Sequence, residues 1–144
     1  MAFCERLSEQ LAVVGTIDPV AGAGGVVSTD VVPMNLHRRC LFTLMTGAVN
    51  TAPGILVNIQ EGTVAVPNSA VILTSAAATV AGVASQYIWE ISGEAMADTY
   101  TVLRGDFTAQ AAGLYAVLVQ ADVERYHPAS DRNLATTTIS GVAN

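Results

Sequence analysis

The sequence predicts an all-β protein, an antiparallel β-sandwich of the jelly-roll-like kind, with a short N-terminal helix and an extended C-terminal arm. Runs of β-branched and apolar residues recur roughly every 8–14 residues. The breaks between them are short and rich in Gly, Pro and small residues, as turns require. No break is long enough for the helix that a parallel crossover needs, so antiparallel pairing is expected.

The 144 residues are expected to form one domain with two terminal extensions. Residues 1–24 would hold the N-terminal helix and a Gly-rich loop. Residues 25–127 would form the β-sandwich body, and residues 128–144 the extended arm. A chain of this length can bury a sufficient apolar core without cross-links.

The N-terminal part combines a helical face with a Gly-rich break. Phe3, Leu7 and Leu11 are spaced four residues apart, which places them on one face of a short helix. Residues 15–25 then contain Pro19 and four glycines, which predict a loop or an irregular edge.

The body is expected to contain seven extended segments. In chain order they are residues 26–34, 39–47, 54–63, 69–77, 84–93, 98–107 and 113–126. Pro33 favours an edge or a bulge in the first segment, because proline donates no backbone hydrogen bond. The run RCLFTLMTG, residues 39–47, is apolar with little alternation and predicts a strand buried on both sides. Residues 94–100 could hold one turn of helix.

Two of these segments alternate clearly. Ile55, Val57 and Ile59 fall on one face of their segment, which is typical of a half-buried strand. Tyr87 and Trp89 share a face in theirs, and we interpret them as core residues or as contact anchors.

Composition excludes several classes of function. Hydrophobic residues make up 51% of the chain and charged residues 12%, about half the usual charged share. So much apolar surface predicts contact with other copies or another protein. The net charge is −6 and the only basic cluster is Arg38-Arg39, which argues against nucleic-acid binding. No apolar run approaches the roughly 20 residues of a membrane-spanning helix, so no membrane partner is expected.

The two cysteines, Cys4 and Cys40, are far apart in sequence. They could form a disulfide or remain reduced thiols, and the second is expected in a protein made in a cytoplasm. The opening residues MAFCERLSEQ carry acids where a secretory signal peptide is apolar, which favours that compartment.

Motifs that suggest catalysis lack the pattern that chemistry requires. The run AGAGG, residues 21–25, would need glycine at Val27 and a following helix to cradle a phosphate. His127, Ser130 and Asp131 are near neighbours in the sequence, whereas a catalytic triad converges from separate elements. We therefore expect a turn at residues 127–131, and no catalytic site.

The remaining candidate functional residues also lack the pattern of a site. The tripeptide Arg104–Asp106 is expected to form a tight turn. His37 and His127 have no partner at metal-ligand spacing, so neither a metal nor another cofactor is expected. The chain is therefore not expected to be an enzyme.

The sequence does not show what would hold the two terminal segments in a fixed structure. Residues 128–144 are polar and bury little by themselves, while fixing each residue costs about 1–2 kcal/mol. They therefore either have no fixed structure or lie on a neighbouring molecule. The Phe3-Leu7-Leu11 face likewise needs a docking surface.

Three segments resemble a known group of proteins. LSEQLAVVGTIDP (residues 7–19), TDVVPMNLHR (29–38) and ERYHPASDRNLAT (124–136) are similar to small proteins encoded in the structural gene clusters of tailed bacteriophages. The likeness implies a capsid cement or decoration protein that binds the outside of the major capsid protein lattice. It also implies a dimer or trimer located on the virion surface.

The residues expected to contact the capsid lie in the two ends. They are Phe3, Leu7, Leu11, Arg125, Tyr126, His127 and Pro128. Two alternatives remain at this point. One is a head–tail joining or tail component, present in few copies. The other is a receptor- or glycan-binding β-sandwich with an exposed aromatic platform, built from Trp89, Tyr87 or Tyr100.

Overall fold

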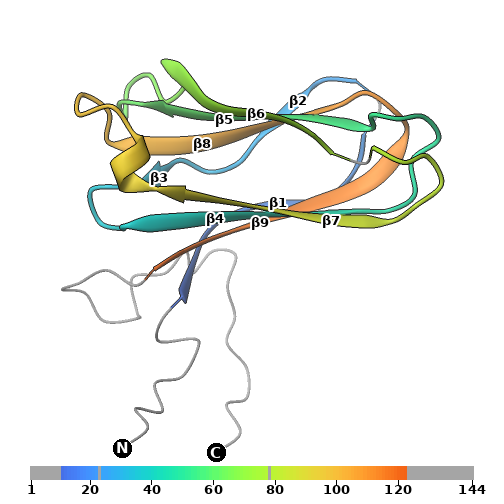
Figure 1. Ribbon diagram of the computed structural model, residues 1–144, viewed down its shortest axis with the longest axis horizontal. Coiled ribbons are helices and arrows are strands. Elements are labelled where there is room, and N and C mark those ends of the chain that lie inside the picture. The colour runs from blue at the N-terminus through green and yellow to red at the C-terminus, as the bar shows by residue number, and fades with distance from the viewer. Residues whose placement is uncertain (1–10, 23, 78, 123–144) are drawn as a thin grey trace, which may run out of the picture.

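The computed structural model describes residues 11–22, 24–77 and 79–122. They form two antiparallel β-sheets packed face to face (Figure 1). This confirms the predicted all-β sandwich. Most of the predicted N-terminal helix, and all of the arm at 128–144, lie outside the described residues.

The elements follow one another along the chain with short connections. The strands are β1 (Leu11–Gly22), β2 (Val26–Ser28), β3 (Val32–Pro33), β4 (Arg39–Thr46), β5 (Ile55–Gly62), β6 (Ala70–Ala77), β7 (Ser85–Ser92), β8 (Val102–Ala109) and β9 (Gly113–Asp122). One 3-10 turn, η1 (Gly93–Ala95), lies in the stretch where a helical turn was expected.

The strand order is that of a jelly roll. Sheet A has the order β1-β9-β4-β7, and sheet B has the order β2-β8-β5-β6, with β3 also paired to β8. Across both sheets, β1 pairs with β9, β2 and β3 with β8, β4 with β7, and β5 with β6. The first strand thus pairs with the last, the next with the last but one, and so on inward, which is the jelly-roll pattern. β2 and β3 together take the place of one strand in this pattern.

The core lies between the two sheets and is built from alternate residues of each strand. Phe42 and Leu44 of β4 face Ile59 of β5 and Phe107 of β8, and all four are fully buried. A Cβ atom added at Gly105 would lie 2.8 Å from the Phe107 ring and 3.1 Å from the Phe42 ring. Glycine in the middle of β8 therefore leaves room for the two aromatic rings.

The expectation for residues 11–25 needs correction. Residues 11–22 form β1, an edge strand paired with β9 along its length, instead of a helix end and a loop. Its register shifts between Val13 and Gly15 and between Ile17 and Val20, and the second shift contains Pro19. A proline is tolerated there because the strand lies at an edge and bulges. The predicted irregular edge is thus present, but as part of the sandwich.

Two further expectations were wrong. Arg104–Asp106 is no turn but the middle of β8, where Gly105 serves the packing of two aromatic rings. β4 is not buried on both sides, because Met45 on its outer face is 46% exposed. The predicted alternation of β5 and of Tyr87 with Trp89 is confirmed, as is the edge position of Pro33.

Candidate interaction surface

The outer face of sheet A carries a group of large apolar side chains at its centre. Large hydrophobic side chains stand on it from three of its strands: Met45 of β4 is 46% exposed, Ile88 of β7 57% and Leu114 of β9 60%. Leu41 and Leu118 are partly buried on the same face. A sheet face that only meets water would carry mostly polar residues, so this composition is typical of a contact surface.

Strand register shows that these residues adjoin. Thr43 lies opposite Ile88 on one side and opposite Leu118 on the other. Although it points outward, Thr43 is only 7% exposed, because the two larger side chains flank it. Met45 lies opposite Ala116, one step along the same strands. The apolar residues therefore form one continuous surface.

Charged residues gather at one end of this face. Arg39 donates from Nη1 to Oε1 of Glu90 over 3.4 Å, and both side chains are more than half exposed. Such an exposed pair contributes little to stability. A hollow of about 290 Å³ opens beside it, with Leu11 and Asp122 also in its lining. The face thus changes from apolar to charged along the strand direction.

Asp122 ties this end of the sandwich together. Its Oδ1 accepts hydrogen bonds from the backbone amides of Arg38 (2.8 Å) and Arg39 (3.2 Å). Nδ1 of His37 contacts the backbone carbonyl of Asp122, which places the ring proton on Nδ1, because a carbonyl only accepts. His37 is buried. It therefore has a structural role among the described residues, joining the end of β9 to the segment before β4.

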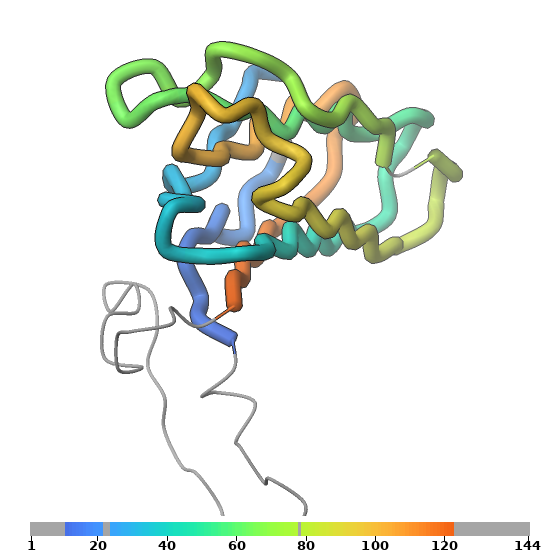
Figure 2. Tube along the Cα trace, turned by 60° about the vertical axis from the view of Figure 1, so that its left-hand side comes forward, coloured from blue at the N-terminus to red at the C-terminus, as the bar shows by residue number. Residues whose placement is uncertain are grey.

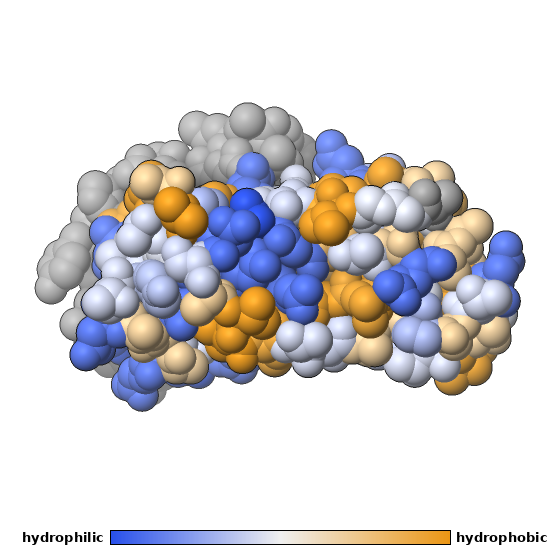
Figure 3. Space-filling view, turned by 90° about the horizontal axis from the view of Figure 1, so that it is seen from above, coloured by the Kyte–Doolittle hydropathy of each residue, from blue (hydrophilic) through white to orange (hydrophobic). Residues whose placement is uncertain are grey.

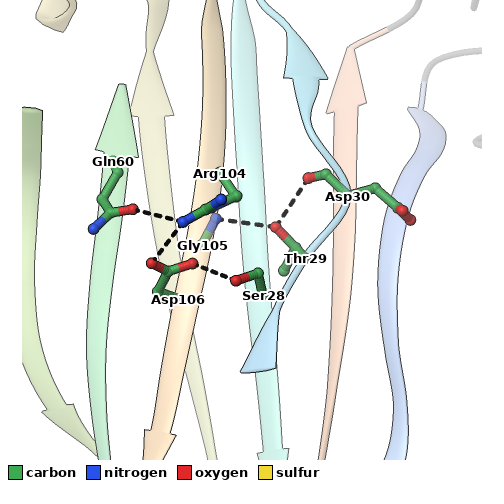
Figure 4. A network of polar contacts seen from close by, with 7 residues as sticks. All are labelled: Ser28, Thr29, Asp30, Gln60, Arg104, Gly105 and Asp106. Carbon is green, nitrogen blue, oxygen red and sulfur yellow. Dashed lines mark hydrogen bonds and ion pairs between the residues drawn. The ribbon is translucent and has the colours of Figure 1, made fainter. Parts of the chain in front are cut away.

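The outer face of sheet B differs, because polar side chains occupy its middle (Figures 3 and 4). Arg104 donates from Nη2 to Oδ2 of Asp106 over 3.0 Å and to Gln60 over 3.4 Å. Ser28 donates to the other oxygen of Asp106 over 2.7 Å. Directly after Ser28, in the link between β2 and β3, the hydroxyl oxygen of Thr29 accepts from the backbone amide of Gly105. These bonds link β2, β8 and β5 side by side.

This polar cluster is mostly satisfied within itself. The Arg104 and Asp106 side chains are 20% and 12% exposed, so each is largely covered by its neighbours. Among the residues that the structure describes, Nε of Arg104 has no hydrogen-bond partner. The charges of Arg104 and Asp106 cancel, so the network carries no net charge. Such a network fixes the register of the strands and leaves few free groups for a ligand.

Most of the residues predicted to contact the capsid fall outside the described ranges. Phe3, Leu7 and residues 125–128 lie there, as do Ser130 and Asp131 of the rejected triad. Leu11 is described; it begins β1, is 37% exposed and lines the hollow with Asp122.

Within the described ranges, Tyr87 and Trp89 do not form the exposed platform that glycan binding would use. Tyr87 and Trp89 stack at 5.9 Å with nearly parallel rings, and Trp89 also meets Phe107 at 6.4 Å. Both pack against the core between the sheets. Tyr100 lies elsewhere, in the connection before β8.

The sequence predicts burial on both sides of residues 39–47, but it does not locate an apolar outer face on sheet A. The run LFTLM of β4 carries large apolar residues at positions of both parities, and so does GLYAVLVQ of β9. Such runs predict burial on both faces. In the described residues only one face of these strands is buried. The other face is therefore an apolar surface that another molecule can cover.

The described part of the chain offers little reactive chemistry. No group of three or more metal-ligating side chains occurs within it, and no helix there is long and apolar enough to cross a membrane. Cys40 is a free thiol inside the sandwich. Burial, with a smaller effect of the nearby Asp122 carboxylate, raises the pKa of Cys40 to about 12, which disfavours the reactive thiolate.

No protein-family model matches the chain. No curated protein matches it. Two similar chains come from solved structures of infectious bursal disease virus, strains Gx and Gt. The first has a TM-score of 0.42 and 10% identity and aligns with 84% of this chain. The second has a TM-score of 0.43 and 8% identity and aligns with 85%. This chain spans about a third of each of them, 32% and 33%.

Proposed function

We propose that this protein is a structural virion protein, a cement or decoration protein that binds the outer surface of a bacteriophage capsid lattice. One observation carries the proposal: two of the three segments that resemble phage structural proteins contact Asp122 at one end of the sandwich, and the third follows Asp122 closely in the sequence. Leu11, in the first segment, is the register partner of Asp122. His37 and Arg38, in the second, hold Asp122, and the third segment begins two residues later.

Both terminal segments therefore start from the same place. Residues 1–10 precede Leu11 and residues 123–144 follow Asp122, and these two residues lie side by side in adjacent strands (Figure 2). A body that presents two segments at one end can sit on a lattice and contact more than one subunit. Each contact raises the effective concentration of the next, so modest contacts add up to stable attachment.

The charge and chemistry of the chain agree with this role. A net charge of −6 suits the outside of a capsid, away from the packaged genome. The jelly roll by itself does not select a function, because capsid and lectin domains share it. The inward stacking of Tyr87 and Trp89 weighs against the glycan-binding alternative.

Sedimentation with capsids tests the proposal. Capsids assembled from the major capsid protein of the same gene cluster, without this protein, would be mixed with the full chain and pelleted. We expect saturation at one copy per capsid subunit or at a simple fraction of one. A handful of copies per particle would instead indicate a head–tail joining or tail component. No binding would overturn the proposal.

A truncation with a matched control locates the contact. Deleting residues 129–144 is expected to weaken capsid binding at least about tenfold, because one of several linked contacts is lost. Val80→Ser changes an exposed residue, 58% accessible, at the opposite end of the sandwich and is expected to leave binding unchanged. Equal binding by the truncated chain would remove the C-terminal segment from the mechanism.

A further inference from the structure

Two copies of the outer face of sheet A are complementary to each other in side-chain size and in charge. We propose that it is the surface through which two copies of this chain form a symmetric dimer, sheet A against sheet A. This inference does not rest on the proposed capsid binding. It starts from the exposed apolar residues Met45, Ile88 and Leu114, and from their contrast with the polar middle of sheet B.

A two-fold axis running along the boundary between β9 and β4 gives the dimer its geometry. It lies in the interface, parallel to the strands, so it places each β4 over β9 of the second copy and each β7 over β1. Residues then meet at the levels that the β4–β9 register sets, with Met45 opposite Ala116 and Thr43 opposite Leu118. Large side chains thus meet small ones, and aligned packing of two sheets needs this interlocking.

The same axis makes the charged end complementary. The β4–β9 ladder pairs Cys40 with Ala121, so Arg39 and Asp122 stand at the next level. Rotation about the axis brings Arg39 of each copy opposite Asp122 of the other. Two ion pairs would then close one end of the interface and fix its register. In a single copy the Arg39 side chain is 69% exposed and that of Asp122 35% exposed, so both can reach a partner.

The area is sufficient for a specific dimer. Four strands spaced about 4.8 Å apart and eight residues long, at about 3.3 Å per residue, give a face of roughly 500 Å². Two such faces bury on the order of 1,000 Å², which is about the smallest area that specific protein interfaces bury. Protruding side chains add further contact area to this flat estimate. The centre is apolar and the charges lie at the rim, as interfaces between proteins are built.

The molar mass of the full chain in solution tests the inference. Light scattering after size exclusion, at about 1–100 µM, is expected to give twice the chain mass of 14.9 kDa. Ile88→Glu places an unpaired carboxylate in the interface and is expected to raise the dissociation constant about 100-fold or more. Val26→Glu is the matched control, because Val26 is 59% exposed on a strand of sheet B and should not affect the dimer.

A second substitution covers failure to fold. Should circular dichroism show that Ile88→Glu is unfolded, Met45→Gln keeps the side-chain length but removes its apolar character, and it is expected to weaken the dimer about tenfold. A monomeric wild-type chain at 100 µM, a trimer, or dissociation by Val26→Glu alone would overturn the inference. A dimer that does not bind capsids would contradict only the proposed function. A monomer that decorates capsids would contradict only the dimer.

Discussion

The carboxylate of Asp122 accepts a hydrogen bond from the backbone amide of Arg38, 84 positions earlier in the chain, over 2.8 Å. A second bond from the amide of Arg39 shares the same oxygen. These bonds hold the last residue of β9 against the start of β4, at the end where both terminal segments begin. Asp122 therefore fixes the end of β9 beside the start of β4.

Asp122→Ala is expected to lower the free energy of unfolding by about 1–2 kcal/mol, because two backbone amides lose a charged acceptor. Asp122→Asn keeps an acceptor oxygen and should lower it less. Urea denaturation measures both changes. Hydrogen exchange at the amides of Arg38 and Arg39 should accelerate in the alanine variant. Asp98→Ala, at an exposed acid, serves as the control and should change stability by less than about 0.5 kcal/mol.

Gly105→Ala is expected to destabilise the protein by about 1–3 kcal/mol. The added methyl group would lie 2.8 Å from the ring of Phe107 and 3.1 Å from that of Phe42, so the core must shift. Gly47→Ala is the control, because its added atom would meet Leu114 at an ordinary 3.5 Å. Thermal unfolding compares the two variants. Equal melting temperatures for both would show that the core yields without cost.

Much of the fold could be predicted because local pattern and packing agree. The alternation of Ile55, Val57 and Ile59 predicts a strand with one buried face, and the sandwich buries that face. Residues 11–22 could not be predicted, because their glycines and Pro19 oppose regular structure locally. They form a strand only because β9 supplies a partner along their whole length. Tertiary pairing decided that element.

The sequence predicts less of the candidate surface than of the fold. The apolar run of β4 predicts burial on both faces, but it does not say whether the same chain or another molecule covers the second face. Only the sheet order shows that Met45 and Ile88 adjoin from separate strands. The tripeptide Arg104–Asp106 likewise favours a turn when the sequence is taken alone. In the fold it lies inside β8, and its side chains bond Gln60 and Ser28 on the neighbouring strands.

Stability is expected to fall at alkaline pH because of Cys40. In the unfolded chain this thiol ionises near its ordinary pKa of 9.0, whereas burial raises the pKa of Cys40 to about 12 in the fold. Its contribution is complete below pH 9 and is lost as pH rises from 9 toward 12, by about 1.4 kcal/mol per pH unit. Burial also raises the pKa of Tyr115, which adds to the loss above pH 10.

Cys40→Ala isolates the thiol. The variant is expected to be less stable at pH 7, because the substitution leaves a small cavity in the core. Its free energy of unfolding should, however, decline less between pH 9 and 11 than that of the wild type. Urea denaturation at several pH values gives both curves. Parallel curves would show that the thiol ionises as readily in the fold as in the unfolded chain.

The Arg104–Asp106 pair gives a prediction about coupling within sheet B. Asp106→Ala leaves Gln60 as the remaining side-chain acceptor of Arg104 among the described residues, and it removes the carboxylate that accepts from the Ser28 hydroxyl. Because both charges are mostly covered, this loss is expected to cost about 1.5–3 kcal/mol, more than an exposed pair would. Arg104→Met, which keeps the aliphatic stem over the sheet, should cost less on its own.

The double variant decides whether the two side chains act together. If Asp106 stabilises the fold chiefly by accepting from Arg104, then Arg104→Met with Asp106→Ala should cost less than the sum of the single changes by about 1 kcal/mol or more. The exposed pair Arg39–Glu90 provides the comparison, because its cycle should give less than about 0.5 kcal/mol in a monomeric background. Additive costs at Arg104 and Asp106 would mean that Ser28 and Gln60, not the ion pair, hold β2, β8 and β5 in register.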